Sequence, residues 1–389
     1  MSARPIPLLL VIYSYPPVLG GSEIEAQRIA AALVGRGYRV KVLCAGLPEM
    51  PGAPEFTGPD GVTLRIFGRG FGPPLLDCAF ALGVAWTLWK ERRNYRLVYF
   101  LMQGLHLAAG LPVARLLGKP IVMKVSGSSV ITAMLRSFTG RLELRWLRKW
   151  ARRVMILNSG MAEEATAAGL RPEQLLWMPN PVDTSEFAPC QPSCRAELRA
   201  GLGVPGDAPV VLYAGRLAPE KELNFLLGGF AAAAKQFPEA LLVLVGDGPE
   251  RETLRARVAS LGLDRLVRFS GRVGIPEVCR WLQASDVFAL VSSNEGFPCS
   301  LTEAMSAGLP SVVSDIPANL QLIDDGVHGL HAALRNEASI ATALARLFSD
   351  PALRSRLGAA ARQRVIDNYS TDKVADRYEA LFAEALDGK

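Results

Sequence analysis

Short aliphatic runs alternate with amphipathic stretches along the first half of the chain. The runs are almost wholly apolar, which is typical of strands in a parallel sheet covered on both faces. They are Leu8–Tyr13, Val40–Cys44, Leu97–Leu101, Ile121–Val125, Val154–Leu157 and Leu175–Met178. The stretches between them have helical patterns, at Ser22–Arg36, Leu75–Arg93, His106–Leu117, Arg141–Trp150 and Gly160–Ala168. This alternation predicts a doubly wound α/β domain.

A proline-containing break separates this series from a second one. Asn180-Pro181-Val182-Asp183 interrupts the pattern, and Pro189–Pro192 extends the break. The second series has predicted strands at Val210–Ala214, Leu241–Val245, Val267–Phe269, Val287–Leu290 and Ser311–Val313, and a nearly all-helical end, Asn336–Leu386. We therefore expect two domains, residues 1–182 and 193–370, that face each other across a cleft. Ligands of such domains bind at the carboxyl ends of the strands.

Composition is compatible with a folded protein of this size. The chain has 389 residues, of which 50% are hydrophobic and 21% charged, so disorder is excluded. The six cysteines are scattered, which argues against a metal knuckle and predicts a reduced compartment. The N-terminal apolar run is short and leads into Pro16-Pro17, so we expect a strand and not a signal peptide. The prediction is a cytoplasmic protein, and peripheral attachment to the inner face of the cell membrane stays open.

Charge is distributed unevenly between the two halves. Residues 1–180 carry 22 Lys+Arg and 11 Asp+Glu, and the remainder carry 21 and 26. The basic half suggests an anionic partner, and the chemistry gives no indication of nucleic acid. Within it, Arg136–Arg153 has seven cations and one acid, and Leu142, Trp146 and Trp150 are spaced four apart. This segment is either an interfacial anchor for an anionic membrane surface or a surface helix whose tryptophans pack inward.

The most informative stretch is Ser293–Pro310, SNEGFPCSLTEAMSAGLP. It contains two carboxylates, Glu295 and Glu303, with seven residues between them. The first belongs to a loop after a predicted strand, and the second to a predicted helix that ends at Gly308 and Pro310. A helix start in this position suits an anion, and carboxylates beside it suit hydroxyl groups. Phosphate flanked by hydroxyls describes a nucleotide sugar.

Two cations follow the first strand of the second series. Arg216 and Lys221 are five residues apart after Gly215, in the sequence AGRLAPEK. On a loop that enters a helix they can converge on one diphosphate, the arginine through bidentate contacts and the lysine as a point charge. The alternative is that Arg216 is a surface ion-pair partner and Lys221 a solvated helix residue.

Two features of the first domain are weaker signals. Gly20 and Gly21 follow the first strand and allow close approach of a ligand to backbone N–H groups. The alternative there is a plain turn with Ser22 as the helix N-cap. His106 starts a helix at the carboxyl end of a strand, where it either contacts a ligand or makes a local polar contact.

Two turns of the second domain complete the candidate set. Gly246, in GDGP, is expected to shape a small turn, and Arg272-Val273 follows a strand near the expected nucleobase. The sequence has no Asp-x-Asp and no H-E-x-x-H, G-x-S-x-G or Walker motif, so it offers no metal–diphosphate site of that kind.

The combination of GGSE, AGRLAPEK, GDGP and EGFPCSLTEAMSAGLP resembles the retaining glycosyltransferases of family 4, over nearly the whole chain. The resemblance implies the GT-B fold, with two Rossmann-like domains and a final helix, 371–389, that crosses back to the first domain. It also implies no cofactor and no metal ion. Ser126-Gly127-Ser128 departs from the polar pair that many relatives have there, on the acceptor side, so the acceptor identity does not carry over.

The resemblance also implies roles for individual residues. Arg216 and Lys221 bind the donor diphosphate, Glu295 holds hydroxyls of the transferred sugar, and Glu303 holds those of the ribose. The backbone of Gly296, Phe297, Pro298, Cys299, Ser300 and Leu301 surrounds the sugar and phosphate, with Gly215 and Gly246 nearby. Gly20 and Gly21 approach the phosphate, His106 lies beside the reacting sugar, and Arg272-Val273 borders the base. His106, Arg216, Lys221 and Glu295 form the predicted catalytic set.

The resulting hypothesis is metal-independent transfer of a hexose from a nucleotide diphosphate sugar, with retention of anomeric configuration. A UDP-sugar is favoured and GDP-mannose comes second, on family frequency. The acceptor is a saccharide or lipid-linked, in cell-surface polysaccharide or glycolipid synthesis. A nucleotide-sugar epimerase, a phosphorylase and a non-catalytic nucleotide-binding protein stay open as alternatives. A dehydrogenase is disfavoured because no G-x-G-x-x-G follows the first strand of either domain.

Overall fold

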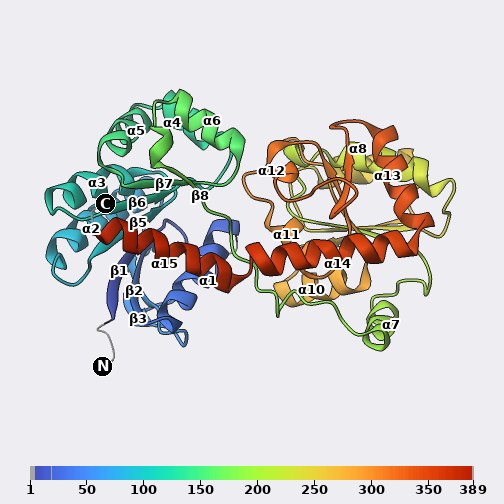
Figure 1. The fold of residues 1–389 in the computed structure, drawn as a ribbon, viewed down its shortest axis with the longest axis horizontal. Helices are drawn as coiled ribbons and strands as arrows, with labels where there is room; N and C mark the ends of the chain where they lie inside the picture. The colour runs from blue at the N-terminus through green and yellow to red at the C-terminus, as the bar shows by residue number, and fades with distance from the viewer. Residues whose placement is uncertain (1–4, 19, 388–389) are drawn as a thin grey trace. The chain divides into compact units, whose positions relative to one another are not determined.

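The computed structural model describes residues 5–18 and 20–387 and divides into two compact units (Figure 1). The first unit contains the residues up to Pro181 together with those from Thr371 onward, and the second is Val182–Ser370. The second unit therefore starts at Val182, whereas the sequence placed its start at residue 193. The proline-rich stretch Pro189–Pro192, which the sequence pattern predicted to be a break, leads directly into helix α7 (Pro192–Gly201). Proline is favoured at the first position of a helix, so this stretch belongs to the start of the second unit.

The first unit contains one mixed sheet. Its strands, as far as the described residues go, are β1 (Ile6–Val11), β2 (Tyr38–Ala45), β3 (Glu55–Thr57), β4 (Thr63–Phe67), β5 (Leu97–Leu101), β6 (Ile121–Lys124), β7 (Arg153–Ile156) and β8 (Leu175–Trp177). The order is β3-β4-β2-β1-β5-β6-β7-β8, and only β3 is antiparallel to its neighbour. Its helices are α1 (Gly21–Gly35), α2 (Leu75–Lys90), α3 (Leu105–Leu116), α4 (Val130–Arg136), α5 (Phe138–Trp150), α6 (Ser159–Ala167) and α15 (Thr371–Asp387).

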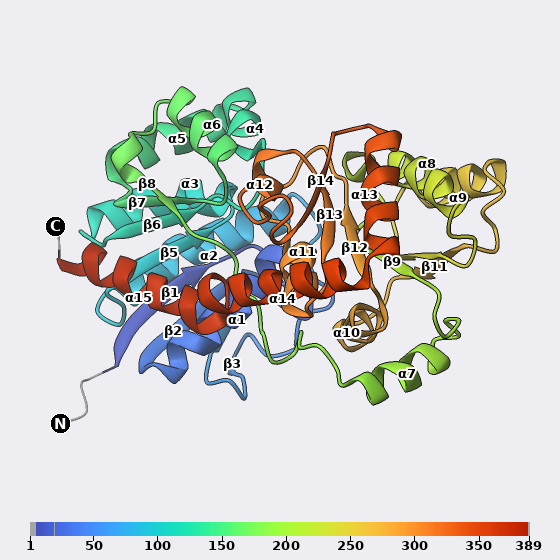
Figure 2. The same ribbon diagram turned by 45° about the vertical axis from the view of Figure 1, so that its right-hand side comes forward.

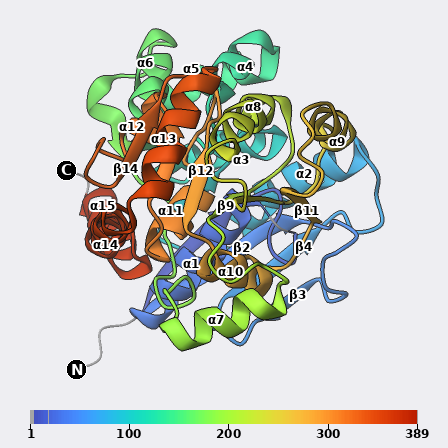
Figure 3. The ribbon, with the colours of Figure 1, turned by 90° about the vertical axis from the view of Figure 1, so that its right-hand side faces the viewer.

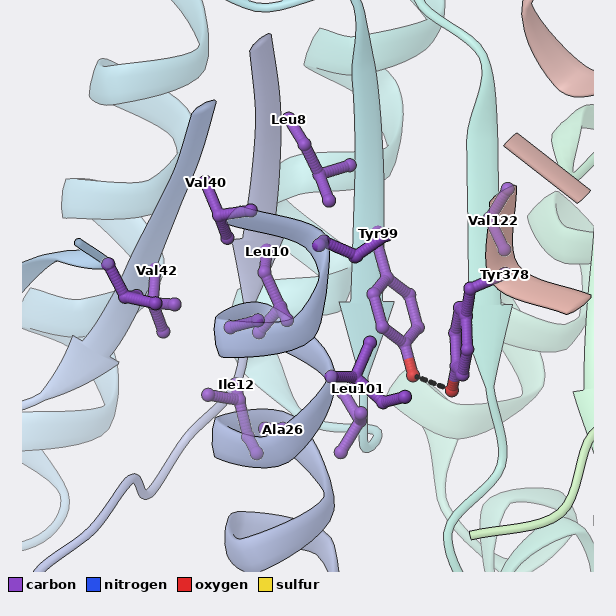
Figure 4. Close-up of a cluster of buried hydrophobic side chains, with 14 of the residues drawn as sticks. Leu8, Leu10, Ile12, Ala26, Val40, Val42, Tyr99, Leu101, Val122 and Tyr378 are labelled. Atoms are coloured by element: carbon purple, nitrogen blue, oxygen red, sulfur yellow. Dashed lines mark hydrogen bonds between the residues drawn. The ribbon is translucent and has the colours of Figure 1, made fainter. Parts of the chain in front are cut away.

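Alternate residues of the central strand β5 show that the sheet is covered on both faces. Tyr99 belongs to the core beneath α1 and α15, where its hydroxyl hydrogen-bonds to Tyr378 at 3.0 Å (Figure 4). The next residue, Phe100, points to α3, because a Cβ added to Gly110 of that helix would lie 2.7 Å from its ring. Successive side chains of a strand point to opposite faces, so both layers are required to bury β5.

The final helix, α15, belongs to the first unit, as the resemblance implied. It packs on α1 with a buried stripe at helical spacing that includes Val374, Tyr378 and Phe382. At its exposed side, Arg36 forms ion pairs of 2.6 Å with both Asp376 and Glu379. The predicted return of the chain end to the first domain is confirmed.

The second unit, whose backbone is described throughout, contains a wholly parallel sheet. Its strands are β9 (Val210–Ala214), β10 (Leu241–Val245), β11 (Val267–Gly271), β12 (Val287–Leu290), β13 (Ser311–Ser314) and β14 (Gly329–Ala332), in the order β11-β10-β9-β12-β13-β14. The helices besides α7 are α8 (Leu223–Ala234), α9 (Arg251–Ser260), α10 (Ile275–Ala284), α11 (Cys299–Ser306), α12 (Pro317–Leu320), α13 (Glu337–Ser349) and α14 (Pro351–Asn368). Helices α8 and α13 pack together on one side of this sheet (Figure 2), and α10 and α7 pack together on the other (Figure 3).

The sequence did not predict the short edge elements. Strands β3 and β4 lie at one edge of the first sheet, and β14, which contains His331, lies at an edge of the second. Edge strands of three to five residues have weak alternation, and their pairing depends on a neighbouring strand that is distant in sequence.

Helix α5 does not bury the face predicted for an inward-packing surface helix, and its role as an interfacial anchor stays a prediction. Its buried residues are Gly140, Glu143, Leu144 and Leu147, so the predicted common face of Leu142 and the tryptophans is not the buried one. Trp146 and Trp150 are half-buried and stack on each other, with ring centroids 5.3 Å apart. No helix among the described residues has the length and apolarity needed to cross a membrane.

Candidate functional site

The predicted site residues of the second unit follow four strands at the same edge of its sheet. The strand order reverses between β9 and β12, and a doubly wound sheet binds ligands at the carboxyl ends of the strands beside such a point. The loop after β9 carries Arg216 and Lys221, and the loop after β12 carries Glu295. The site therefore forms at the reversal, from segments that are distant in sequence.

Lys221 and Glu295 meet across this reversal. The Lys221 ammonium lies 2.7 Å from Glu295 Oε1, and the two side chains are 17% and 10% exposed. The Ser292 hydroxyl donates to the same oxygen, also at 2.7 Å. Water screens the attraction between these two charges less than it screens that of an exposed pair. The alternative in which Lys221 is a solvated helix residue is therefore wrong.

Arg216 is placed differently. Its side chain is 66% exposed and its guanidinium pairs with Glu220 at 2.6 Å, while its carbonyl accepts a hydrogen bond from the Tyr213 hydroxyl at 2.8 Å. The backbone at Arg216 is thus fixed, and the guanidinium is held by an exposed i,i+4 pair of small net strength. A role for Arg216 in binding a diphosphate stays a prediction.

Helix α11 supplies the predicted anion site next to Glu295. It begins after Pro298, whose carbonyl accepts hydrogen bonds from the N–H groups of Leu301 and Thr302, and the positive end of its dipole lies at this start. The buried ring of Phe297 packs edge-on against Tyr369, with centroids 6.0 Å apart, which fixes the entry of the chain into the helix. Glu303 is half-buried on the same helix.

The end of α11 matches the prediction. Gly308 has φ +78°, and the N–H of Leu309 donates to the carbonyl of Ala304 at 3.0 Å. This is the hydrogen-bond pattern of a helix stop at a left-handed glycine. The predicted helix end at Gly308 is confirmed.

Gly246 allows two loops of the site to pack closely against each other. A Cβ at this position would lie 1.9 Å from the carbonyl oxygen of Gly215, so the loops after β9 and β10 approach each other only because residue 246 is glycine. The two loops are also joined by a hydrogen bond of 3.0 Å from Leu217 N to Asp247 O. In the loop after β11, Arg272 is exposed and Val273 half-buried.

The candidate residues of the first unit follow three neighbouring strands, β1, β5 and β6, in loops or in the first turns of helices. Helix α1 starts at Gly21 with Gly20 as its N-cap, and no side chain caps it, so Ser22 is inside the helix and is not its cap. A Cβ at Gly20 would lie 2.3 Å from the carboxylate of Glu23, which is buried beside it. Ser126, Gly127 and Ser128 are half-buried after β6.

His106 is buried at the start of α3, 2% exposed, with its ring 5.0 Å from that of Phe80. Burial lowers the pKa of His106 to about 4, against a backbone hydrogen bond to Met102 that favours the charged form. The imidazole is therefore neutral at physiological pH. Its Nε2 is buried without a hydrogen-bond partner among the described residues, which is costly unless a ligand supplies one.

Glu143 is a buried carboxyl group that the sequence did not single out. It comes from α5, is 2% exposed, and takes a backbone hydrogen bond from Gly104, next to the turn that carries His106. Burial raises the pKa of Glu143 to about 7, and the hydrogen bond from Gly104 opposes this rise. The available signal was its isolation as the single acid among seven cations.

The pKa of Glu143 predicts a pH-dependent stability that Glu143→Gln should remove. Between about pH 4.5 and pH 7, the unfolded chain has released a proton that the folded protein keeps, so rising pH favours unfolding of the wild type. Glutamine does not titrate. The melting temperature of Glu143→Gln relative to that of the wild type should therefore be higher at about pH 8 than at about pH 5.

The control for this experiment is Glu163→Gln, on the exposed side of α6. It should follow the wild type at both pH values. Burial lowers the pKa of His106, so its contribution to stability rises with pH, opposite to that of Glu143. The test is therefore the difference between the variant and the wild type, and not the pH profile of the wild type alone. Equal pH shifts in wild type and Glu143→Gln would contradict the assignment.

The described His, Cys, Asp and Glu side chains do not cluster as metal ligands. Within residues 5–18 and 20–387, no three His, Cys, Asp or Glu side chains gather in a way that could hold a metal ion. All six cysteines lie in the described part of the chain and are free thiols.

Comparison with known proteins shows related sequences in both units. The model "Glycosyltransferase Family 4" matches residues 19–186, and "Glycosyl transferases group 1" matches residues 195–364. The chain is 25% identical over 388 residues to alpha-D-kanosaminyltransferase of Streptomyces kanamyceticus, covering 93% of this chain and 99% of the relative. It is 29% identical over 373 residues to the GDP-mannose-dependent alpha-(1-6)-phosphatidylinositol monomannoside mannosyltransferase of Mycolicibacterium smegmatis, covering 93% and 94%.

A solved structure shows the same fold. The crystal structure of Anabaena HepE in complex with UDP and glucose matches with a TM-score of 0.80 and 20% sequence identity, over 97% of this chain and 100% of that one. At this identity the match establishes the architecture.

Proposed function

Because the chain belongs to the glycosyltransferases of family 4 type with the GT-B fold, we propose that it transfers a hexose from a nucleotide diphosphate sugar, with retention of configuration and without a metal ion. The acceptor in this proposal is a saccharide or a lipid-linked saccharide of cell-surface polysaccharide or glycolipid synthesis. The observation that carries the proposal is the partly buried Lys221–Glu295 pair beside the start of α11.

In this proposal, Lys221 and the start of α11 contact the diphosphate, and Glu295 contacts the sugar that is transferred. As the bond between the sugar and the diphosphate breaks, negative charge grows on the phosphate. We propose that Lys221 and the positive end of the α11 dipole stabilise that charge. Arg216 adds a second cation when the diphosphate replaces Glu220 as its partner, which is feasible because an exposed pair is weak.

Glu295 is suited to hold sugar hydroxyls and not to attack the sugar. Its Oε1 receives both the Lys221 ammonium and the Ser292 hydroxyl, which spread its charge and lower its nucleophilicity. A retaining reaction without a carboxylate nucleophile has the acceptor hydroxyl attack on the side that the phosphate leaves. The new glycosidic bond then forms as the bond to the phosphate oxygen breaks, and that oxygen takes the proton of the acceptor. Glu303 is proposed to hold the ribose hydroxyls.

The first unit supplies groups for hydroxyl recognition. The unpartnered Nε2 of neutral His106 is proposed to hydrogen-bond a substrate hydroxyl, and Ser126 and Ser128 to contact the acceptor. UDP is the favoured nucleotide, in line with the UDP of the HepE crystal structure. GDP-mannose comes second, in line with the donor named for the mycobacterial relative.

A ligand screen in the presence of EDTA tests this proposal. Thermal melts with UDP, GDP and their hexose derivatives should show a rise in melting temperature for one nucleotide, since a ligand that binds the folded state stabilises it. Proton NMR of the sugar released from that donor should show first the anomer that the donor carries.

The alternatives give different results in the same experiment. An epimerase would change the sugar while the nucleotide stays attached, and a phosphorylase would need inorganic phosphate. A binding protein would shift the melting temperature without turnover. Loss of nucleotide binding in EDTA, or release of the opposite anomer first, would overturn the proposal.

A further inference from the structure

Helix α2 exposes an apolar face to solvent. From Leu75 to Trp89, a stretch that the structure describes in full, each exposed side chain is apolar, and they include Leu75, Leu82, Trp86 and Trp89 at 63%, 70%, 59% and 47% exposure. The one charged residue in this stretch, Asp77, is half-buried and accepts a hydrogen bond of 2.6 Å from the Tyr13 hydroxyl. We call this exposed row the α2 ridge.

The α2 ridge is distinct from the part of the helix that covers the sheet. Leu76, Phe80, Val84 and Leu88 are buried and already give α2 its packing face. A surface helix normally has polar residues opposite that face, and an exposed apolar row of this length marks an interaction site. Leu116, 75% exposed at the end of the adjacent helix α3, adds to the apolar surface.

Cations surround the end of the ridge. Helices α2, α3 and α5 each precede a parallel strand, so their C-terminal ends lie at the amino-terminal edge of the sheet. The exposed cations in the last turns of α2 and α3 and in the segment after α2, which we call the basic rim, are Lys90, Arg92, Arg93, Arg96 and Arg115. The neighbouring acid, Glu91, is half-buried and paired with Lys41 at 3.0 Å and Arg65 at 2.7 Å.

The basic rim and the ridge are physically continuous. The guanidinium of Arg92 lies 5.4 Å from the ring of Trp89, and its Nη1 donates to the Trp89 carbonyl at 3.0 Å. Lys119, after α3, donates to the Tyr95 carbonyl at 2.7 Å, which joins the ends of α2 and α3.

A basic hollow of about 510 Å³ lies at the same edge. Its lining includes Arg115, Lys119, Lys149, Arg152, Arg153 and Arg171. The two acids in the lining are each beside an arginine, Glu173 near Arg171 at 3.6 Å and Glu384 in contact with Arg153. The hollow therefore has a net positive charge and enough room for a phosphate-bearing headgroup.

We propose that the α2 ridge, the basic rim and the basic hollow form one docking surface for a bilayer that contains anionic phospholipid. The ridge enters the interface, where tryptophan is favoured, and the cations at its end contact lipid phosphates. This places the contact of the ridge on Trp86 and Trp89, while α5 contributes Lys149 and Trp150 to the lining of the hollow. The inference extends the proposed function by giving access to lipid-linked acceptors, but membrane binding itself does not depend on turnover.

The charges favour a membrane over a second copy of the chain. In a symmetric dimer built on the α2 ridge, the same patch would face itself, so cations of one rim would approach those of the other. An anionic lipid surface would instead supply negative charges that pair with these cations. The loop that carries His106 lies at the carboxyl edge of the first sheet, at the opposite ends of its strands, and is not covered by the basic rim.

Flotation of the full chain with vesicles tests the proposal. We expect binding to vesicles of phosphatidylcholine with phosphatidylglycerol and little binding to phosphatidylcholine alone. Trp86→Ser with Trp89→Ser should reduce the partition coefficient at least about tenfold, and Arg92→Gln with Arg93→Gln by roughly fivefold per cation. Both double variants should keep the wild-type melting temperature and the wild-type shift with nucleotide, so a failure here is separable from a failure of the proposed function.

Phe138→Ser is the matched control, because Phe138 is 76% exposed at the start of α5 and outside the proposed surface. It should bind vesicles as the wild type does. The proposal is overturned by absence of wild-type binding, by unchanged binding of the Trp86 and Trp89 variant, or by loss of binding in Phe138→Ser alone. Light scattering that shows a dimer which the ridge variant dissociates, without vesicle binding, would assign the ridge to a second copy instead.

Discussion

Lys221→Ala is expected to slow sugar transfer by at least about a hundredfold, since loss of one preorganised charge-stabilising group typically has this effect. The lysine is the cation that the structure holds in place, 2.7 Å from Glu295 and 17% exposed. Its removal takes a positive charge from the leaving phosphate and also leaves Glu295 without its counter-ion. The uncompensated carboxylate would then repel the diphosphate. Initial rates of nucleotide release with saturating donor measure the effect.

Arg216→Ala provides the comparison, and Lys235→Ala the control. Arg216 is 66% exposed and must exchange Glu220 for the diphosphate, so its loss should slow transfer less than the loss of Lys221. Lys235 is exposed at the end of α8 and should have no effect. A rate for Lys221→Ala within about threefold of wild type, in a variant that keeps its melting temperature, would contradict the assignment of the phosphate-stabilising charge.

Lys124→Met is expected to destabilise the first unit by about 3–5 kcal/mol, the usual result of removing one partner of a buried ion pair. Lys124, at the end of β6, is fully buried in contact with Glu25 of α1, which is 2% exposed. Its ammonium also donates to Asn180 Oδ1 at 2.8 Å, and Glu25 accepts from the Tyr378 hydroxyl at 2.8 Å. The network thus joins α1, β6 and α15. Since whole domains are stable by about 5–15 kcal/mol, this loss should be visible in chemical denaturation as a large shift of midpoint.

A double variant separates the charge effect from the packing effect. In Lys124→Met with Glu25→Leu, no unpaired charge stays buried, and much of the lost stability should return. Lys373→Met, at an exposed position of α15, should unfold like the wild type. If Lys124→Met and Lys373→Met unfold at the same denaturant concentration, the buried pair is not a determinant of stability.

Local patterns in the sequence predicted the elements that local physics controls. The bounds Leu97–Leu101 of β5 were predicted as observed. A short, continuous apolar run between polar residues is typical of a strand that is buried on both faces of a parallel sheet. The end of α11 followed from Gly308, whose left-handed conformation is a property of that residue. The resemblance motifs likewise lie in single loops, so the candidate residues of both units could be listed before their positions were known.

Only the tertiary structure decided which of these groups meet. Lys221 and Glu295 are 74 residues apart, and their contact depends on β9 and β12 being neighbours in the sheet. The burial of Glu143, and with it the pKa of about 7, depends on the packing of α5 against α3. The exposure of Trp86 and Trp89 could not be inferred from a helix that is apolar on nearly all sides. Sequence pattern reports short-range preference, whereas burial, ion pairing and pKa depend on neighbours that folding brings from elsewhere in the chain.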